Sequence, residues 1–157
     1  MNDAQAVSTV NIEHDVTLIT LDSVPNQMST ISAIFTAIAE AQINIDMISQ
    51  STPYGGMVNI SFSLPSQDLV KVINVLGNFK NEIPDLRVDV NANNSKLSIH
   101  GEGMRNTPGV AAKFFRLLDQ KAIQIKLITT SEVDISCLIY ERDMEKLEMV
   151  VKQAFDI

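Results

Sequence analysis

Residues 101–115, GEGMRNTPGVAAKFF, place two glycines and a Pro-Gly pair directly before a run with helical spacing. The entrance of a helix leaves backbone N–H groups unpaired and carries the positive end of the helix dipole, so this stretch could bind an anion. Gly109 would let the backbone approach a ligand closely because it has no Cβ. The alternative is purely structural: the Pro-Gly pair starts the helix, with Pro108 in the first turn.

The pattern does not fit a nucleotide phosphate. Asn106 stands where the G-x-G-x-x-G motif requires its third glycine, and no Gly-Lys-Ser/Thr follows. A carboxylate would suffice as the anion, and a free amino acid would also bring an ammonium group that needs acceptors. The candidate acceptors are Asn26, Asn106, Gln124 and Glu132.

The sequence contains no recognisable catalytic constellation. Cys137, the one cysteine, lies in an apolar, alternating segment and is predicted to be a small core residue. His14 is expected in a linker, and His100, at the end of a strand, in a structural or rim role. One cysteine allows neither an intrachain disulfide nor a thiolate cluster for a metal. We therefore expect a binding module without catalytic residues, cofactor or metal.

Charge and hydropathy narrow the class of protein further. The formal net charge is −7 over 157 residues, which disfavours a nucleic-acid-binding surface or a polybasic membrane anchor. The N-terminus lacks the basic start and apolar run of a secretory signal, and no stretch approaches the roughly 18 apolar residues of a membrane span. The sequence predicts a soluble cytoplasmic protein that binds neither nucleic acid nor membrane.

The sequence also contains an internal repeat. A shift of 80 residues aligns INIDMISQS with IQIKLITTS, and NQMSTI with NTPGVA. Beyond residue 51 the shift falls to 75 and aligns VNISFSL with VDISCLI, and SQDLVKVINVL with ERDMEKLEMVV. The difference marks TPYGG, residues 52–56, as an insertion in the first copy. Two copies of one unit therefore fill the chain.

Each copy has the hydrophobic pattern of strand, helix, strand, strand, helix. In the first copy we expect strands at 15–21, 43–49, 57–64 and 86–92, and helices at 29–41 and 67–79 with Ser66 as an N-cap. The turn residues of the insertion predict a hairpin between the two middle strands. In the second copy we expect strands at 95–100, 123–131 and 133–139. The first copy thus completes the β-α-β-β-α-β order of a ferredoxin-like unit.

The second copy lacks a sixth element, whereas QAVSTVNI at residues 5–12 reads as an unassigned strand. We predict an α+β fold of two ferredoxin-like βαββαβ units in tandem, with the N-terminal strand completing the second unit. Residues 14–94 would form the first domain, and residues 6–13 plus 95–157 the second. The alternative is a five-element second unit behind a disordered N-terminus.

The two copies resemble the tandem ACT domains of aspartokinases. The second copy resembles the second ACT domain of that family through GEGMRNTPGVAA and QIKLITTSEVDIS, and the first copy resembles the first through INIDMISQS and VNISFSL. The resemblance extends from about residue 6 to residue 157. It implies two ACT domains, the first inserted into the second. Such a pair binds lysine, threonine or both as feedback inhibitors of the first step of aspartate-family amino acid synthesis.

The resemblance also implies a set of ligand-binding residues, carried over position by position. From the first copy they are Asn26, Gln27, Met28, Ser29, Ile31 and Gln50. From the second copy they are Asn106, Thr107, Pro108, Gly109, Val110, Gln124, Ile125, Thr130, Ser131 and Glu132.

Four residues depart from the family pattern. Asn26 replaces a carboxylate, Met28-Ser29 replaces Pro-Gly, and Gln124 replaces an asparagine. Loss of a charged partner would cost on the order of 1.5–3 kcal/mol of binding free energy, so we expect an altered ligand or affinity at the first loop.

We therefore expect an allosteric regulatory module of an aspartate kinase. The kinase segment of the family opens with K-F-G-G-[TS], which this sequence lacks, so the partners would be an aspartate kinase catalytic domain or subunit and a lysine or threonine effector. A homodimer with sheets joined side by side is expected, because open sheet edges need protection. The alternative is a free-standing tandem ACT protein that acts as an interaction or scaffold module with altered or lost ligand binding.

Overall fold

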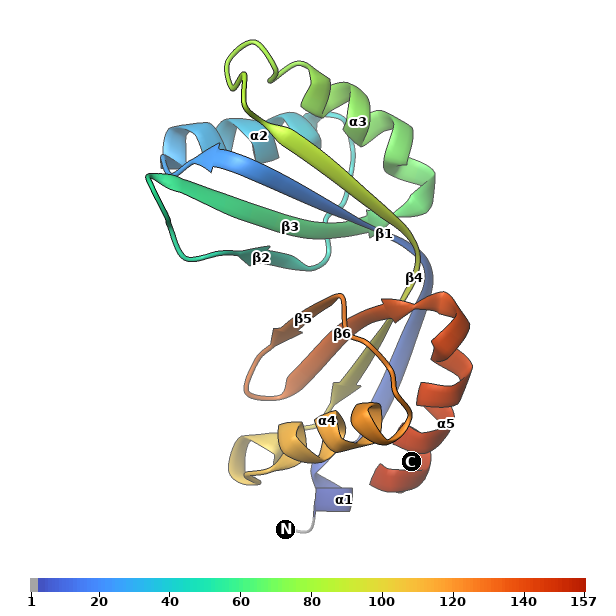
Figure 1. Ribbon diagram of the computed structural model, residues 1–157. Coiled ribbons are helices and arrows are strands. Elements are labelled where there is room, and N and C mark those ends of the chain that lie inside the picture. Colours follow the sequence, from blue (N-terminus) through green and yellow to red (C-terminus); the bar gives the residue numbers. More distant parts are fainter. Residues whose placement is uncertain (1–2) are drawn as a thin grey trace. The chain divides into compact units, whose positions relative to one another are not determined.

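The computed structural model describes residues 3–157, which fold into two compact units (Figure 1). The first unit comprises Asp15–Ala92. The second unit combines the N-terminal segment through His14 with Asn93–Ile157. These boundaries differ by one residue at the start and two at the end from those expected from the repeat, 14–94.

The first unit contains four strands and two main helices. They are β1 (Thr9–Pro25, from Asp15 on), α2 (Met28–Glu40), β2 (Ile48–Gln50), β3 (Met57–Pro65), α3 (Leu69–Gly77) and β4 (Arg87–His100, up to Ala92). The strands lie in the order β2-β3-β1-β4, and β3 pairs antiparallel with both β1 and β2. The predicted hairpin between the middle strands is confirmed. In Figure 1 both helices lie on one side of these strands, and between them the apolar faces bury Ile19, Phe62, Ile34 and Leu76.

The second unit repeats this arrangement with pieces from both ends of the chain. It contains α1 (Asp3–Ala6), the first residues of β1, the end of β4, α4 (Val110–Gln120), β5 (Leu127–Thr130), β6 (Asp134–Tyr140) and α5 (Met144–Phe155). Its strands lie in the order β1-β4-β6-β5, with β6 antiparallel to β4 and β5. The core contains Leu97, Phe114, Leu147 and Phe155, each fully buried. The α+β prediction of two ferredoxin-like units is confirmed.

The N-terminal segment belongs to the second unit, as predicted. The Ser8 backbone N–H donates a hydrogen bond of 2.8 Å to the His100 carbonyl. A Cβ added at Gly101 would lie 1.9 Å from the carbonyl oxygen of Ala6, so only glycine allows this approach of the two segments. The alternative of a five-element unit behind a disordered N-terminus is therefore wrong for the described residues.

The prediction that His14 lies in a linker is wrong. β1 is one continuous strand through His14, whose ring Nδ1 lies 3.1 Å from Ser95 Oγ on β4. The chain passes between units at His14–Asp15 and again at Ala92–Asn93, and both places lie inside strands. The residues just after each passage, Asp15 and Asn93, have left-handed φ values of 55° and 63°. The polar composition around His14 concealed the continuity of the strand.

Two element boundaries in the first unit also differ from expectation. Ser66 does not cap α3: a short 3-10 turn, η1 (Ser66–Asp68), precedes the helix, and Ser66 Oγ lies 2.8 Å from Thr17 Oγ1. The strand expected at 43–49 shortens to β2, because the Met47 N–H donates to the Ser63 side chain rather than to a regular ladder partner.

One strand of the second unit is also shorter than expected. The segment predicted as a strand over 123–131 contributes only β5. No helix among residues 3–157 is long and apolar enough to span a membrane.

Candidate functional site

A hollow of about 250 Å³ opens in the second unit between the entrance of α4 and the end of β5. We call it the second-unit hollow. Its lining residues are Met104, Thr107, Gly109, Val110, Ala111, Thr130, Ser131, Glu132 and Ile135. Two segments about twenty residues apart in sequence thus converge on a single small cavity.

The entrance of α4 is shaped by Gly109. This residue is the N-cap, with φ 95° and ψ −4°, a left-handed conformation that L side chains rarely adopt. The helix consequently begins at Val110, which is 3% exposed and anchors the first turn in the core. Pro108 lies outside the helix, so the structural alternative of proline in the first turn is wrong. The N–H groups of the first turn have no intrahelical acceptors, as at any helix start, and the residues at this entrance help to line the hollow.

The loop before α4 is held by its own hydrogen bonds. A 3-10 turn, η2 (Glu102–Asn106), follows β4, and the Thr107 hydroxyl donates a 2.8 Å bond to the Gly103 carbonyl. Thr107 itself is 7% exposed. The wall of the hollow is therefore fixed by backbone and core contacts.

The opposite wall is the tight turn between β5 and β6. The Ser131 N–H donates to the Asp134 carbonyl at 2.8 Å, and the Val133 N–H donates to Ser131 Oγ at 3.2 Å. Glu132, at the tip, is exposed and pairs with Arg105 from the facing turn. The rim thus presents a carboxylate and a guanidinium beside the positive end of α4. A zwitterion could satisfy these groups, whereas an isolated exposed ion pair adds little stability.

The structure collects six of the ten second-copy residues implied by the resemblance. These are Thr107, Gly109, Val110, Thr130, Ser131 and Glu132. The other four lie outside the lining: Asn106, Pro108 and Gln124 are exposed, and Ile125 is half-buried against the core.

Sequence reasoning missed three residues of the lining, Met104, Ala111 and Ile135. The signal that could have found Ile135 is strand alternation after the turn, since it starts the buried face of β6.

In the first unit, the corresponding loop has a different geometry. α2 begins at Met28, two residues earlier than α4 under the shift of 80, and its N-cap Gln27 has an ordinary extended φ of −131°. Met28 and Ser29 are therefore helical where Pro108 and Gly109 are not. A longer helix is the direct consequence of replacing Pro-Gly, since nothing then holds the entrance in a left-handed turn.

Most of the residues predicted in the first unit lie at the surface. Asn26, Gln27, Met28 and Ser29 are exposed, Ile31 is a core residue at 7% exposure, and Gln50 is exposed at the end of β2. None of the six lines the hollow that this unit does contain.

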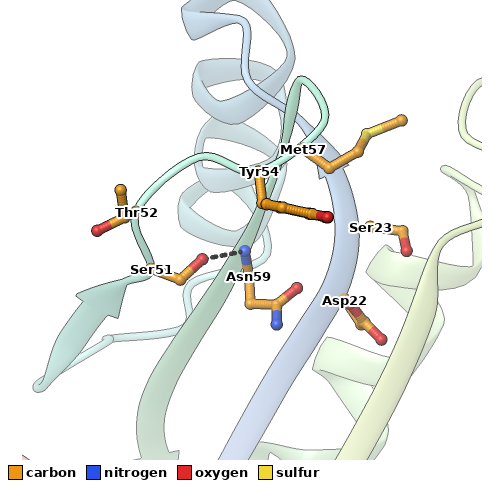
Figure 2. Close-up of a pocket in the computed structure, with 7 residues that line it drawn as sticks. All are labelled: Asp22, Ser23, Ser51, Thr52, Tyr54, Met57 and Asn59. Atoms are coloured by element: carbon orange, nitrogen blue, oxygen red, sulfur yellow. Dashed lines mark hydrogen bonds between the residues drawn. The ribbon is translucent and has the colours of Figure 1, made fainter.

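That first-unit hollow, of about 340 Å³, is shown in Figure 2. Its lining residues are Asp22, Ser23, Ser51, Thr52, Tyr54, Met57 and Asn59. It lies between a bulge of β1, where Ser23 has φ 63°, and the inserted TPYGG loop. The insertion reaches back to the helix entrance, because the Asn26 N–H donates to the Gly56 carbonyl at 2.9 Å. The inserted loop therefore accepts a hydrogen bond from an N–H group next to the α2 entrance.

The remaining chemically notable residues have structural surroundings. Cys137 is fully buried, as predicted, and burial raises the pKa of its thiol to about 12. His100 ends β4 beside Asp134, with its Nδ1 4.0 Å from a carboxylate oxygen. No group of three or more His, Cys, Asp or Glu side chains in the described part of the chain is placed to hold a metal ion.

The chain matches the family model described as "ACT domain" at residues 22–78 and 97–155. It is 37% identical to an aspartokinase of Bacillus sp. (strain MGA3) over 157 residues, which are 100% of this chain and 38% of that protein. It is 34% identical to aspartokinase 2 of Bacillus subtilis (strain 168) over 94% of this chain and 36% of that protein. The chain thus spans well under half the length of these relatives.

Among solved structures, the regulatory subunit of aspartate kinase from Thermus thermophilus, in its ligand-free form, matches with a TM-score of 0.87 and 31% identity. The match covers 96% of this chain and 99% of that subunit. A chain from a structure of aspartokinase alpha and beta subunits matches with a TM-score of 0.86 and 34% identity, over 97% of this chain and 100% of that one.

Proposed function

Because the chain belongs to the ACT domain family and is a regulatory, non-catalytic part of the aspartokinase type, we propose that it senses lysine or threonine for feedback inhibition of an aspartate kinase. The observation that carries the proposal is the second-unit hollow, where the α4 entrance and the Thr130–Glu132 turn meet. We propose that the partner is the kinase, in the same chain or as a separate subunit. We also propose that both act in the cytoplasm.

The chemistry of the hollow supports an amino-acid ligand. The ligand carboxylate would accept hydrogen bonds from the first N–H groups of α4, which the left-handed Gly109 leaves at the open end of the helix. The ligand ammonium would lie toward Glu132 and the hydroxyls of Thr130 and Ser131. Arg105 would then no longer be the sole partner of Glu132, because the ligand ammonium adds a second positive charge at the rim.

Regulation follows if the ligand has different affinities for two arrangements of the assembly with the kinase. A ligand shifts an equilibrium only by its differential affinity for the two states, and the coupling is reciprocal. We propose a homodimer in which the exposed edge strands β2 or β5 pair across an interface, which would also protect the sheet edges.

A second candidate, a scaffold without a ligand, is favoured by one observation in the first unit. The six residues expected to bind there are not among those that line the first-unit hollow, and α2 begins without the left-handed turn. If the second-unit hollow also bound no ligand, the chain would serve only as an interaction module.

Calorimetry with lysine and threonine, separately and together, distinguishes the two candidates. We expect saturable heat with at least one of them, and a higher melting temperature, because a ligand at about 100 times its Kd stabilises by about 2.7 kcal/mol. Glu132→Gln should weaken binding at least tenfold, whereas Glu145→Gln, a change at another exposed glutamate on α5, should not. Absence of heat and of a melting shift with both amino acids would refute the sensor proposal and favour the scaffold.

A further inference from the structure

Arg105 lies between two glutamates at the rim of the second-unit hollow. Its guanidinium pairs through Nη1 with Glu132, at the tip of the turn between β5 and β6. Its Nη2 lies 3.6 Å from Oε2 of Glu102, which begins the same 3-10 turn, η2, that carries Arg105. One guanidinium thus connects the two walls of the hollow, and it has a second carboxylate on its own wall.

The two glutamates differ in their relation to the hollow. Glu132 is one of the lining residues, whereas Glu102 and Arg105 are not. The pair between Arg105 and Glu132 therefore uses a carboxylate that a ligand in the hollow would also contact. The pair between Arg105 and Glu102 leaves that carboxylate available. If Arg105 moved away from Glu132, its charge would still have a carboxylate partner in Glu102.

The bridge can rearrange through its side chains alone. Both turns that carry it are held by their own hydrogen bonds. The three side chains are by contrast partly solvated, with exposed fractions of 48% for Arg105, 76% for Glu102 and 73% for Glu132. Exposed side chains change rotamer within picoseconds to nanoseconds. Arg105 can therefore exchange one glutamate for the other without a movement of the backbone.

The charge balance of the bridge favours one added cation. Its two carboxylates outnumber its one guanidinium, so the three side chains together carry a net charge of −1. An ammonium group would bring this net charge to zero and would allow each carboxylate to pair with one cation. Arg105 would then pair with Glu102, and the ammonium with Glu132.

The first copy lacks this arrangement. Under the shift of 80 residues, Pro25 stands where the second copy has Arg105, and proline carries no charge. The first unit thus forms the same fold without the bridge, so folding alone does not explain it. The bridge is found in the unit whose first helix begins after the left-handed Gly109.

We propose that Arg105 is a specificity-determining residue that competes with the ligand ammonium for Glu132. In the ligand-free chain the guanidinium holds Glu132. When an amino acid binds, its ammonium takes that carboxylate and Arg105 pairs with Glu102 alone. The inference rests on the proposed function, because it requires an amino acid in the second-unit hollow. It adds that a ligand without an ammonium group cannot displace Arg105 and gains nothing from Glu132.

The expected effect on affinity is small but measurable. An exposed ion pair of ordinary strength is closed roughly 1.4 to 5 times as often as it is open. A ligand that needs the open form binds more weakly in proportion to the fraction of protein that is open. Removing the guanidinium should therefore tighten binding about two- to sixfold.

Calorimetric titration of the full chain with lysine and threonine tests the sign of this effect. We expect Arg105→Gln to bind the effective amino acid about two- to sixfold more tightly than the wild type. Glu102→Gln should bind it more weakly, because Arg105 then has no second carboxylate to move to. Unchanged affinity of Arg105→Gln would overturn the proposal. Weaker affinity would also overturn it, since Arg105 would then contact the ligand itself.

Arg116→Gln is the matched control. It removes the same charge from an exposed position on α4 that does not line the hollow. We expect this variant to bind as the wild type does. Equal tightening in Arg105→Gln and Arg116→Gln would overturn the proposal, because the loss of one positive charge anywhere on the unit would then explain the result.

Nuclear magnetic resonance follows the guanidinium directly. The Nε–H signal of Arg105 is the one that is absent from the spectrum of Arg105→Gln. We expect saturating ligand to move this signal in the wild type toward its position in ligand-free Glu132→Gln, where Arg105 retains only Glu102. A signal that does not move while the ligand saturates the protein would overturn the exchange of partners.

The failure of this proposal is distinguishable from that of the proposed function. Saturable heat from the wild type, with no tightening in Arg105→Gln, would reject the competition and leave the sensor in place. No heat with either amino acid, from the wild type and from Arg105→Gln alike, would reject the sensor and the competition together.

Discussion

Two glycine-to-alanine substitutions, at Gly109 and Gly77, should have opposite effects on stability although the chemical change is the same. Neither added methyl group would meet another atom within 4 Å, so steric overlap contributes to neither. The two positions differ in backbone conformation: Gly109 has φ 95°, whereas Gly77 lies in the last turn of α3. Comparing the two substitutions therefore isolates the effect of backbone conformation on the free energy of unfolding.

The magnitudes follow from that difference. A left-handed conformation costs an alanine roughly 1–2 kcal/mol, so Gly109→Ala should lower the free energy of unfolding by about 1 kcal/mol or more. In a helix, alanine is favoured over glycine by about 0.8–1 kcal/mol, so Gly77→Ala should raise it by up to that amount. The two variants should thus differ by about 2 kcal/mol, with wild type between them.

Urea denaturation of the three proteins measures these values directly, and lysine and threonine titrations follow on the same samples. Gly109→Ala can relieve its strain by letting α4 start earlier, as α2 does at Met28, which would displace the N–H groups at the helix entrance that we propose bind the ligand. We therefore expect at least tenfold weaker binding for Gly109→Ala and no change for Gly77→Ala. If both variants shifted stability in the same direction, the conformational reasoning would fail. Unchanged binding by a destabilised Gly109→Ala protein would remove the α4 entrance from the site.

Further predictions concern the second unit. Gly101→Ala should destabilise the protein by more than about 2 kcal/mol in urea denaturation, because the new methyl group would overlap the Ala6 carbonyl backbone. Cys137, whose pKa burial raises to about 12 from 9.0, should not react with a thiol reagent at pH 8 until the unit unfolds. The thiol ionises at a lower pH in the unfolded chain than in the folded one. The stability advantage of wild type over Cys137→Ala should therefore be full below about pH 9 and decline as the pH rises toward 12. Denaturation at pH 8 and pH 10.5 can measure this decline.

The repeat was sufficient to predict the fold because it marks backbone positions as well as core residues. Gln42 and Ala122, separated by the shift of 80, both adopt left-handed φ values after their helices, 61° and 52°. Hydrophobic spacing in the first copy predicted a helix over 29–41, and the structure contains it as α2 with Ile34 buried. These features depend on local sequence, which a single chain displays.

What the sequence could not predict depends on partners far along the chain. The continuity of β1 through His14 follows from pairing with β4, some eighty residues later. Ser66 bonds to Thr17 rather than capping its helix, and no local pattern could reveal that partner. The lining of the second-unit hollow includes Met104 for the same reason, since its position is set by how the segments pack in three dimensions.

The two copies differ at the entrance of their first helix. In the second unit Gly109 holds a left-handed turn before α4, whereas α2 of the first unit begins two residues earlier under the shift of 80, at Met28, behind an extended Gln27. If ligand binding depends on that turn, the second unit is the one that binds, and Gly109→Ala is the substitution that tests this most directly.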